Sequence, residues 1–253
     1  MPRMFPSGGP AGTSSGGTSG GGEGTGPAAL LRPEAIDAVV FDYGGVLTTP
    51  VSDSIRSWLT RDGIDPASFS RTLKTWLSRS APEGTPIHRL ETGELSIGDF
   101  DRLLAAELLA TTGGPVSPVG LVRGLFAGLR PDPAMFGLAE DIRRCGVRVA
   151  LLSNSWGNPY PRDRIDAIFS PVVISGEVGM RKPNADIFRH TLNLLGTTPA
   201  RVVFVDDAEP NTDGASRLGL HAVLHIDSGT TRRALAGFVP GLLSHHQLTE
   251  ENS

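Results

Sequence analysis

Short apolar runs recur along the chain and predict buried β-strands, because a strand covered on both faces is apolar along its whole length. The runs fall at residues 38–47, 147–154, 171–175, 201–207 and 221–226. The first run, AVVFDYGGVL, stops at paired glycines, which is typical of a buried parallel strand that ends in a tight loop.

Segments with apolar positions at helical spacing separate these strands. Residues 132–146 gather their apolar side chains on one helical face and end in a glycine, and residues 183–196 open with Pro183 and end in another glycine. Strand and helix therefore alternate. We predict an α/β fold with a parallel sheet core flanked by helices.

Residues 50–130 interrupt this alternation with about four helix-length patterns and no strand signal. The third pattern starts at Ser96, a predicted N-cap, and the fourth starts at Ser117 and Pro118. The apolar positions of the four patterns are Ile55, Trp58 and Leu59; Phe69, Leu73, Trp76 and Leu77; Phe100, Leu103, Leu104 and Leu108; and Leu121, Val122, Leu125 and Phe126. We predict a helical insertion directly after the first strand.

A polar connection at residues 87–95, inside this insertion, is predicted to be a solvated loop, with a position facing a functional site as the alternative. Its polar side chains are His88, Arg89, Glu91 and Glu94. We therefore place no firm site residue in it.

The predicted domains follow from these patterns and from composition. Residues 1–28 are rich in Gly and Ser and are predicted to be a disordered tail, since so few apolar side chains cannot offset the entropy of ordering. The core is assigned to residues 33–49 and 131–240, the helical domain to 50–130, and a C-terminal tail to 241–253.

Charge and hydropathy exclude two classes of partner. The net charge is −4 and the 23 Lys and Arg residues are scattered, which is not expected of a nucleic-acid-binding protein. No segment approaches the ~20 apolar residues of a membrane span, and the start of the chain lacks the apolar run of a signal peptide. A single cysteine, Cys145, cannot form an internal disulfide. We expect a cytoplasmic protein that binds neither nucleic acid nor membrane.

Polar side chains with catalytic chemistry gather at the carboxyl ends of the predicted strands, where ligands bind in open parallel sheets. These residues are Asp42, Ser153, Asn154, Lys182, Asp206 and Asp207. The adjacent acids at the end of an apolar strand suit a hard divalent cation such as Mg²⁺, which prefers oxygen ligands. Taken singly, Asp42 also fits a turn cap, Ser153 an N-cap and Lys182 a surface lysine.

Four stretches, in order along the chain, carry a family resemblance: VVFDYGGVL, LLSNS, GMRKPNADIF and FVDDAEPN. They resemble the four motifs of haloacid dehalogenase-like hydrolases, and residues 50–130 resemble the helical cap inserted after the first motif. The resemblance extends from about residue 36 to residue 226. It implies a Rossmann-like core and a Mg²⁺-dependent hydrolase acting on a small phosphorylated substrate.

The resemblance also implies a nucleophile and a metal site. Asp42 would attack phosphorus and form an aspartyl phosphate, which water then hydrolyses. Mg²⁺ would be held by Asp42, the main-chain carbonyl of Gly44, Asp206 and Asp207. The cation would relieve the repulsion between a carboxylate nucleophile and an anionic phosphoryl group.

Further residues would bind the transferring group. Lys182 would neutralise its charge, with Arg181 as the competing candidate. Ser153 and Asn154 would contact phosphoryl oxygens, assisted by backbone N–H groups if a helix starts there, and Gly45 would allow close backbone approach. Two more residues are assigned to the surroundings: Trp156 either to the pocket wall or to plain packing, and Asn211 to a helix cap beside the site.

One departure from the family pattern is Gly44, because most phosphatases of the family carry an aspartate at this position as general acid and base. Positioned proton transfer contributes roughly 10² to 10⁴ in rate. We therefore predict a preference for leaving groups that depart readily, such as those of anomeric sugar, acyl or aryl phosphates. A water or His88 is the stand-in for the missing acid.

Two alternatives to a phosphatase remain. A 2-haloacid dehalogenase shares the fold and the nucleophile, although its first motif places the aromatic residue one position later and its chemistry needs no metal. A catalytically silent binding or regulatory protein is the other alternative, and Gly44 is the reason to consider it.

Overall fold

The computed structural model describes residues 35–78, 84–157 and 160–243. The described elements all belong to one unit of the chain, Glu34–Ser253. The predicted tail at 1–28 lies outside the described residues, as does most of the predicted tail at 241–253.

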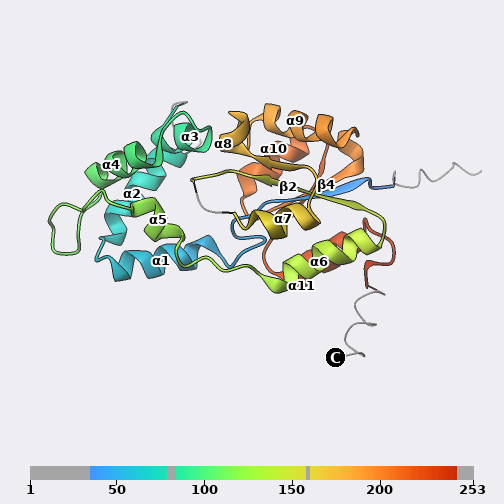
Figure 1. Cartoon of the computed structure of the whole chain (residues 1–253), viewed down its shortest axis with the longest axis horizontal. Coiled ribbons are helices and arrows are strands. Elements are labelled where there is room, and N and C mark those ends of the chain that lie inside the picture. The colour runs from blue at the N-terminus through green and yellow to red at the C-terminus, as the bar shows by residue number, and fades with distance from the viewer. Residues whose placement is uncertain (1–34, 79–83, 158–159, 244–253) are drawn as a thin grey trace, which may run out of the picture. The chain divides into compact units, whose positions relative to one another are not determined.

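A five-stranded sheet forms the centre of the core, in the order β3-β2-β1-β4-β5, with every neighbouring pair parallel (Figure 1). The strands are β1 (Ala38–Phe41), β2 (Arg148–Ser153), β3 (Val172–Ile174), β4 (Val202–Asp206) and β5 (His221–Leu224). The predicted parallel α/β fold and all five predicted strands are thus confirmed. Phe41 of β1 pairs with Leu151 and Val205, so the carboxyl ends of the three central strands meet at one edge of the sheet.

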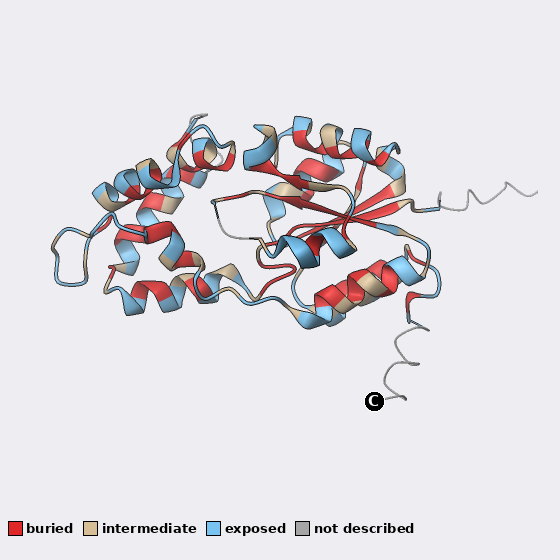
Figure 2. Cartoon of the chain, viewed as in Figure 1, coloured by how far each residue is buried: buried red, intermediate tan, exposed pale blue. Residues whose placement is uncertain are grey.

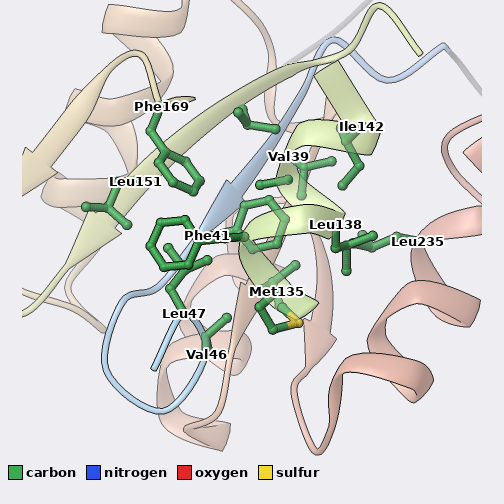
Figure 3. Close-up of a cluster of buried hydrophobic side chains, with 14 of the residues drawn as sticks. Val39, Phe41, Val46, Leu47, Met135, Leu138, Ile142, Leu151, Phe169 and Leu235 are labelled. Atoms are coloured by element: carbon green, nitrogen blue, oxygen red, sulfur yellow. The ribbon is translucent and has the colours of Figure 1, made fainter. Parts of the chain in front are cut away.

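Helices cover both faces of the sheet because the side chains of each strand alternate between them. Val39 and Phe41 pack on one face with α6 (Pro133–Arg144) and α11 (Ser228–Ala236), in a cluster that includes the labelled residues of Figure 3. Val40 points to the other face. Figure 2 shows the buried residues gathered along the strands and on the helix sides that face them.

The second face of the sheet is covered by α9 (Ala185–Leu195) and α10 (Glu209–Arg217), with Phe188 and Phe204 in edge-to-face contact at 5.3 Å. Two shorter helices, α7 (Arg162–Ile168) and α8 (Ser175–Val178), follow β2 and β3. None of the described helices is long and apolar enough to cross a membrane.

Five helices lie between β1 and α6 in the sequence and have a hydrophobic cluster of their own. They are α1 (Val51–Arg61), α2 (Pro66–Leu77), α3 (Pro86–Glu91), α4 (Ile97–Glu107) and α5 (Leu121–Phe126), called the α1–α5 bundle below. Trp58, Phe69, Trp76 and Phe100 form the aromatic centre of that cluster. The structure has a helix at each of the four predicted patterns, and Ser96 is the N-cap of α4, accepting from the Asp99 N–H.

Three sequence predictions differ from the structure. Helix α5 begins at Leu121, after Gly120 in the left-handed conformation, rather than at residues 117–118. Helix α9 begins at Ala185 rather than at Pro183. The connection at 87–95 is not a solvated loop, because most of it lies in or next to α3, which has Pro86 at its first turn and buries Ile87 and Leu90.

Candidate active site

Two buried carboxylates share one ammonium group at the carboxyl edge of the sheet. Asp42 directly follows β1 and Asp206 ends β4, and the register places them side by side. Lys182 Nζ lies 2.6 Å from Asp42 Oδ1 and 2.6 Å from Asp206 Oδ2. The lysine is 1% exposed, so its ammonium group is buried beside these two carboxylates. The structure thus brings together three of the predicted site residues.

Asn154 holds the backbone of Lys182 in place. Its side-chain Nδ2 donates to the Lys182 carbonyl at 3.0 Å, and its Oδ1 accepts from the Lys182 N–H at 2.9 Å. Both ends of the amide are therefore used inside the protein. The geometry makes Asn154 a positioning residue for the lysine, a role that the sequence did not indicate.

Asp206 is fixed from a second direction by α10. Asn211 Nδ2 lies 3.0 and 3.1 Å from the two Asp206 oxygens, and the Ala208 N–H donates to Oδ1 at 2.9 Å. Asn211 was predicted to cap a helix, but the N-cap of α10 is Ala208 and Asn211 lies within the first turn. Its amide orients the carboxylate instead.

Asp207 completes an acidic cluster with Asp42 and Asp206, whose carboxylate oxygens lie within 4.8 Å of one another. Its position depends on Gly45, which has φ +83°: a Cβ there would lie 2.2 Å from Asp207 Oδ2. The Gly45 N–H donates to Thr48 Oγ1 at 2.9 Å, within its own turn. Gly44 lies beside this cluster, in the lining of a cavity described below, and a Cβ at position 44 would meet only Val51 Cγ2, at 3.5 Å.

The charges of this cluster are unbalanced. Burial raises the pKa of Asp42 to about 7, opposed by Lys182 and reinforced by Asp206 and Asp207. Partial desolvation and repulsion by Asp206 raise the pKa of Asp207 to about 6. Asp207 is nevertheless an exposed residue, so water weakens both effects. Burial lowers the pKa of Lys182, but Asp206 and Asp42 outweigh burial and hold it above its ordinary value.

This imbalance and the donor atoms suit a divalent cation. Three carboxylates against one ammonium leave an excess of negative charge, and every side-chain donor is an oxygen, the ligand that Mg²⁺ prefers. Asp42, Asp206 and Asp207 are the residues that could hold such an ion.

Ser153 ends β2, and its Oγ lies 3.0 Å from the hydroxyl of Tyr160. Tyr160 in turn packs on the Tyr43 ring at 4.9 Å, and burial raises its pKa. Residues 154–157 are not helical, so the N–H groups of a helix N-terminus, considered from the sequence, do not support Ser153.

Glu91, placed in a solvated loop by the sequence analysis, is 5% exposed and lies at the end of α3. Its carboxylate accepts from Trp156 Nε1 at 2.9 Å and from Arg181 Nε at 2.5 Å. Its carbonyl accepts from Ser175 Oγ at 2.6 Å. Glu91 thus joins the bundle to the loops that carry the site. Arg181 is thus paired with Glu91, and it is not among the residues that line the cavity with Asp42.

A cavity of about 260 Å³ lies at this edge of the sheet. Its polar lining consists of Asp42, Glu91, Ser153, Asn154, Lys182, Asp207 and Asn211, together with Gly44. Its apolar lining consists of Val51, Ile55, Leu125, Phe126, Leu129 and Trp156. Trp156 is therefore both a wall residue and a packed one, with ring contacts to Phe100 and Phe126. His88 does not line this cavity but a separate one beside Arg89 and Asn184, so its role as stand-in acid is not supported.

Comparisons with known proteins show the family and the fold. The sequence model of the haloacid dehalogenase-like hydrolases matches residues 36–219. A sesquiterpene phosphatase of Aspergillus oryzae is 27% identical over 205 residues, which cover 77% of this chain and 92% of the relative.

Solved structures share the fold. A predicted hydrolase of this type from Porphyromonas gingivalis superposes with a TM-score of 0.57 at 26% identity, covering 79% of this chain and 98% of that one. A related enzyme from Bacteroides thetaiotaomicron, solved with magnesium and inorganic phosphate, has a TM-score of 0.55 at 20% identity and covers 76% and 95% of the two chains.

Proposed function

Because the chain belongs to the haloacid dehalogenase-like hydrolase family, we propose that it is a phosphatase that acts on a small phosphorylated substrate through Asp42. The observation that carries the proposal is the Lys182 ammonium, bonded to Asp42 and Asp206 with Asp207 close by. A carboxylate nucleophile, a fixed positive charge and oxygen ligands are thus gathered in one cavity. The Aspergillus relative, which matches most of its length to this chain, is itself a phosphatase.

The proposed reaction has two displacements at phosphorus. A carboxylate oxygen of Asp42 bonds to phosphorus while the bond from phosphorus to the ester oxygen breaks, and the leaving oxygen then takes a proton from water to become a hydroxyl. Water then attacks phosphorus, the bond to the Asp42 oxygen breaks, and one proton is released with the phosphate. The net change is hydrolysis of the ester, with the Asp42 carboxylate restored.

Mg²⁺ belongs to this proposal as a resident ion held by Asp42, Asp206, Asp207 and the Gly44 carbonyl. When bound, it supplies positive charge that lowers the repulsion between the Asp42 carboxylate and the phosphoryl group. The Bacteroides enzyme of the same fold was solved with magnesium and phosphate. Dehalogenation needs no metal, whereas the three-carboxylate cluster suits a cation, and for this reason we favour phosphate ester hydrolysis.

The remaining site residues are assigned by their contacts. Lys182 balances charge on the transferring group, and the Ser153 hydroxyl donates a hydrogen bond to a phosphoryl oxygen. Asn154 and Asn211 hold Lys182 and Asp206 in place, while Gly45 leaves room for the Asp207 carboxylate. We assign the α1–α5 bundle as the cap that closes the cavity and excludes water.

The test is phosphate release from a panel of phosphate monoesters with Mg²⁺, comparing the wild type with Asp42→Asn. The amide is nearly isosteric but cannot act as the nucleophile, so we expect turnover to fall by at least about 10³-fold with an unchanged circular dichroism spectrum. Asp163→Asn, on the exposed side of α7, is the control and should keep full activity. Retention of more than a few per cent of turnover by Asp42→Asn would overturn the assignment.

A further inference from the structure

The residues that line the catalytic cavity form a polar group and an apolar group, and the two groups come largely from different elements of the fold. The loops at the carboxyl edge of the sheet contribute nearly all of its charged and polar groups. The α1–α5 bundle and the segment after it contribute Val51, Ile55, Leu125, Phe126 and Leu129, and the loop after β2 adds the Trp156 ring. A substrate whose phosphoryl group meets Asp42 must therefore place its leaving group against an apolar wall.

Several of these wall side chains keep some accessible surface. Val51, Ile55, Phe126 and Leu129 are each only partly buried, and each lines the cavity. Burying such surface against an apolar ligand is favourable, whereas a hydroxylated ligand would lose hydrogen bonds to water there.

The polar groups beside this wall are already paired. Glu91 is bonded to Arg181 and Trp156, and the Asn154 amide is bonded at both ends to Lys182. Among the described lining residues, Lys182 is the one cation, and it binds the two carboxylates. The wall thus offers no charge to bind a carboxylate or a second phosphate on the leaving group.

Size narrows the ligand further. The cavity of about 260 Å³ lies just below the usual range of small-molecule pockets, about 300 to 1,000 Å³. It therefore favours a compact leaving group on a phosphoryl group placed at Asp42.

Gly44 adds an independent constraint, because it supplies no acid to protonate the leaving oxygen. An aryl oxide leaves without a proton far more readily than an alkoxide. The leaving group must therefore be compact, and it must suit an apolar wall that contains the aromatic rings of Phe126 and Trp156. It must also leave through a weakly basic oxygen. We propose that the substrate is an aryl phosphate whose leaving group is a small, uncharged phenol. This inference rests on the proposed phosphatase function.

The experiment compares two aryl phosphates whose phenols are similar in acidity but differ in charge and size. With Mg²⁺ present, we expect kcat/KM for 4-methylphenyl phosphate to exceed that for phosphotyrosine by at least about tenfold. A single extra or missing methylene in a hydrophobic pocket is already worth about 10- to 200-fold, and the amino-acid group of phosphotyrosine is larger and charged. Glucose 1-phosphate and phosphoserine complete the panel and should be poorer than both.

A wall variant tests the assignment of the pocket. Ile55→Arg places a cation in the apolar wall, so it should lower kcat/KM for 4-methylphenyl phosphate and shift the ratio toward phosphotyrosine at least about tenfold. Leu103→Arg, on an exposed position of α4 outside the cavity lining, is the matched control and should leave both values unchanged.

The outcomes separate the two proposals. Release from phosphotyrosine, phosphoserine or glucose 1-phosphate that equals or exceeds release from 4-methylphenyl phosphate overturns the aryl assignment and leaves the phosphatase standing. An unchanged substrate ratio in folded Ile55→Arg overturns it as well. No release from any member of the panel overturns both proposals.

Discussion

Lys182 and Arg181 are neighbours of the same charge, and their surroundings in the structure separate their roles. Lys182 bonds to Asp42 and Asp206, while Arg181 bonds to Glu91. A preorganised charge at the reacting group is typically worth about 10² to 10³ in rate.

We expect Lys182→Ala to lose turnover by that factor and Arg181→Ala to lose far less, measured as kcat below the unfolding temperature of both variants. The reverse ranking would move the neutralising charge to Arg181. Thermal melts of both proteins show whether lost activity reflects lost structure.

Gly44 and Gly45 are adjacent glycines with opposite tolerance for a side chain. A Cβ at position 44 meets only ordinary van der Waals contact, and a Cβ at 45 collides with the Asp207 carboxylate at positive φ. Gly44→Asp should therefore fold and restore a general acid.

We expect Gly44→Asp to raise kcat/KM for alkyl phosphates, relative to aryl phosphates, by up to about 10²-fold, toward the lower end of the usual gain from positioned proton transfer. Gly45→Ala is the contrasting variant and should lose activity through displacement of Asp207. No relative gain for alkyl phosphates in Gly44→Asp would mean that the leaving group receives its proton elsewhere.

At the scale of elements, α3 is the helix that meets the loops of the site. Its Glu91 forms a buried ion pair with Arg181, with side-chain exposures of 6% and 13%. Removing one partner of such a pair typically costs about 3 to 5 kcal/mol, because the other charge stays buried and uncompensated.

We expect Glu91→Ala to lower the free energy of unfolding by about 3 kcal/mol, and the double variant with Arg181→Ala to lose clearly less than the sum of the single losses. Arg56→Ala, which breaks an exposed pair with Asp53, is the control and should change stability little. Urea titration measures the free energy of unfolding of the four variants and of the wild type. Strict additivity of Glu91→Ala and Arg181→Ala would show that the pair is not coupled.

At the scale of the whole molecule, the site links stability to pH. The pKa values of Asp42, about 7, and Asp207, about 6, lie above the ordinary carboxyl value of 3.8. Between pH 3.8 and about pH 7, the cation-free protein therefore binds more protons in the folded state than in the unfolded state. Its free energy of unfolding should fall as pH rises through this window.

A divalent cation needs these carboxylates ionised, so added Mg²⁺ should raise the melting temperature more at about pH 8 than at about pH 5.5. Differential scanning calorimetry with and without Mg²⁺ measures the difference. Asp206→Asn should remove most of the Mg²⁺ effect at the higher pH. An equal shift at both pH values, or no shift at all, would contradict a cation site at these carboxylates.

Local patterning by itself predicted the strands, most of the helices and the sheet edge at which the candidate site lies. Apolar β-branched runs gave five parallel strands, because a strand buried on both faces must be apolar throughout, and the polar residue that ends such a run lies at the sheet edge. Asp42, Ser153 and Asp206 were found in this way, since each directly follows or ends a strand.

Only the tertiary structure decided how those residues are used. Asn154 binds Lys182 across 28 positions of sequence, and Glu91 binds Arg181 across 90, so no local pattern records either contact. A short polar stretch such as residues 87–95 is predicted to be solvated, because the spacing of its apolar residues does not reveal which distant residues the fold places against it. The apolar wall has the same origin, because helical spacing predicts that Ile55 is apolar and packed but not that it shares a cavity with Asp42.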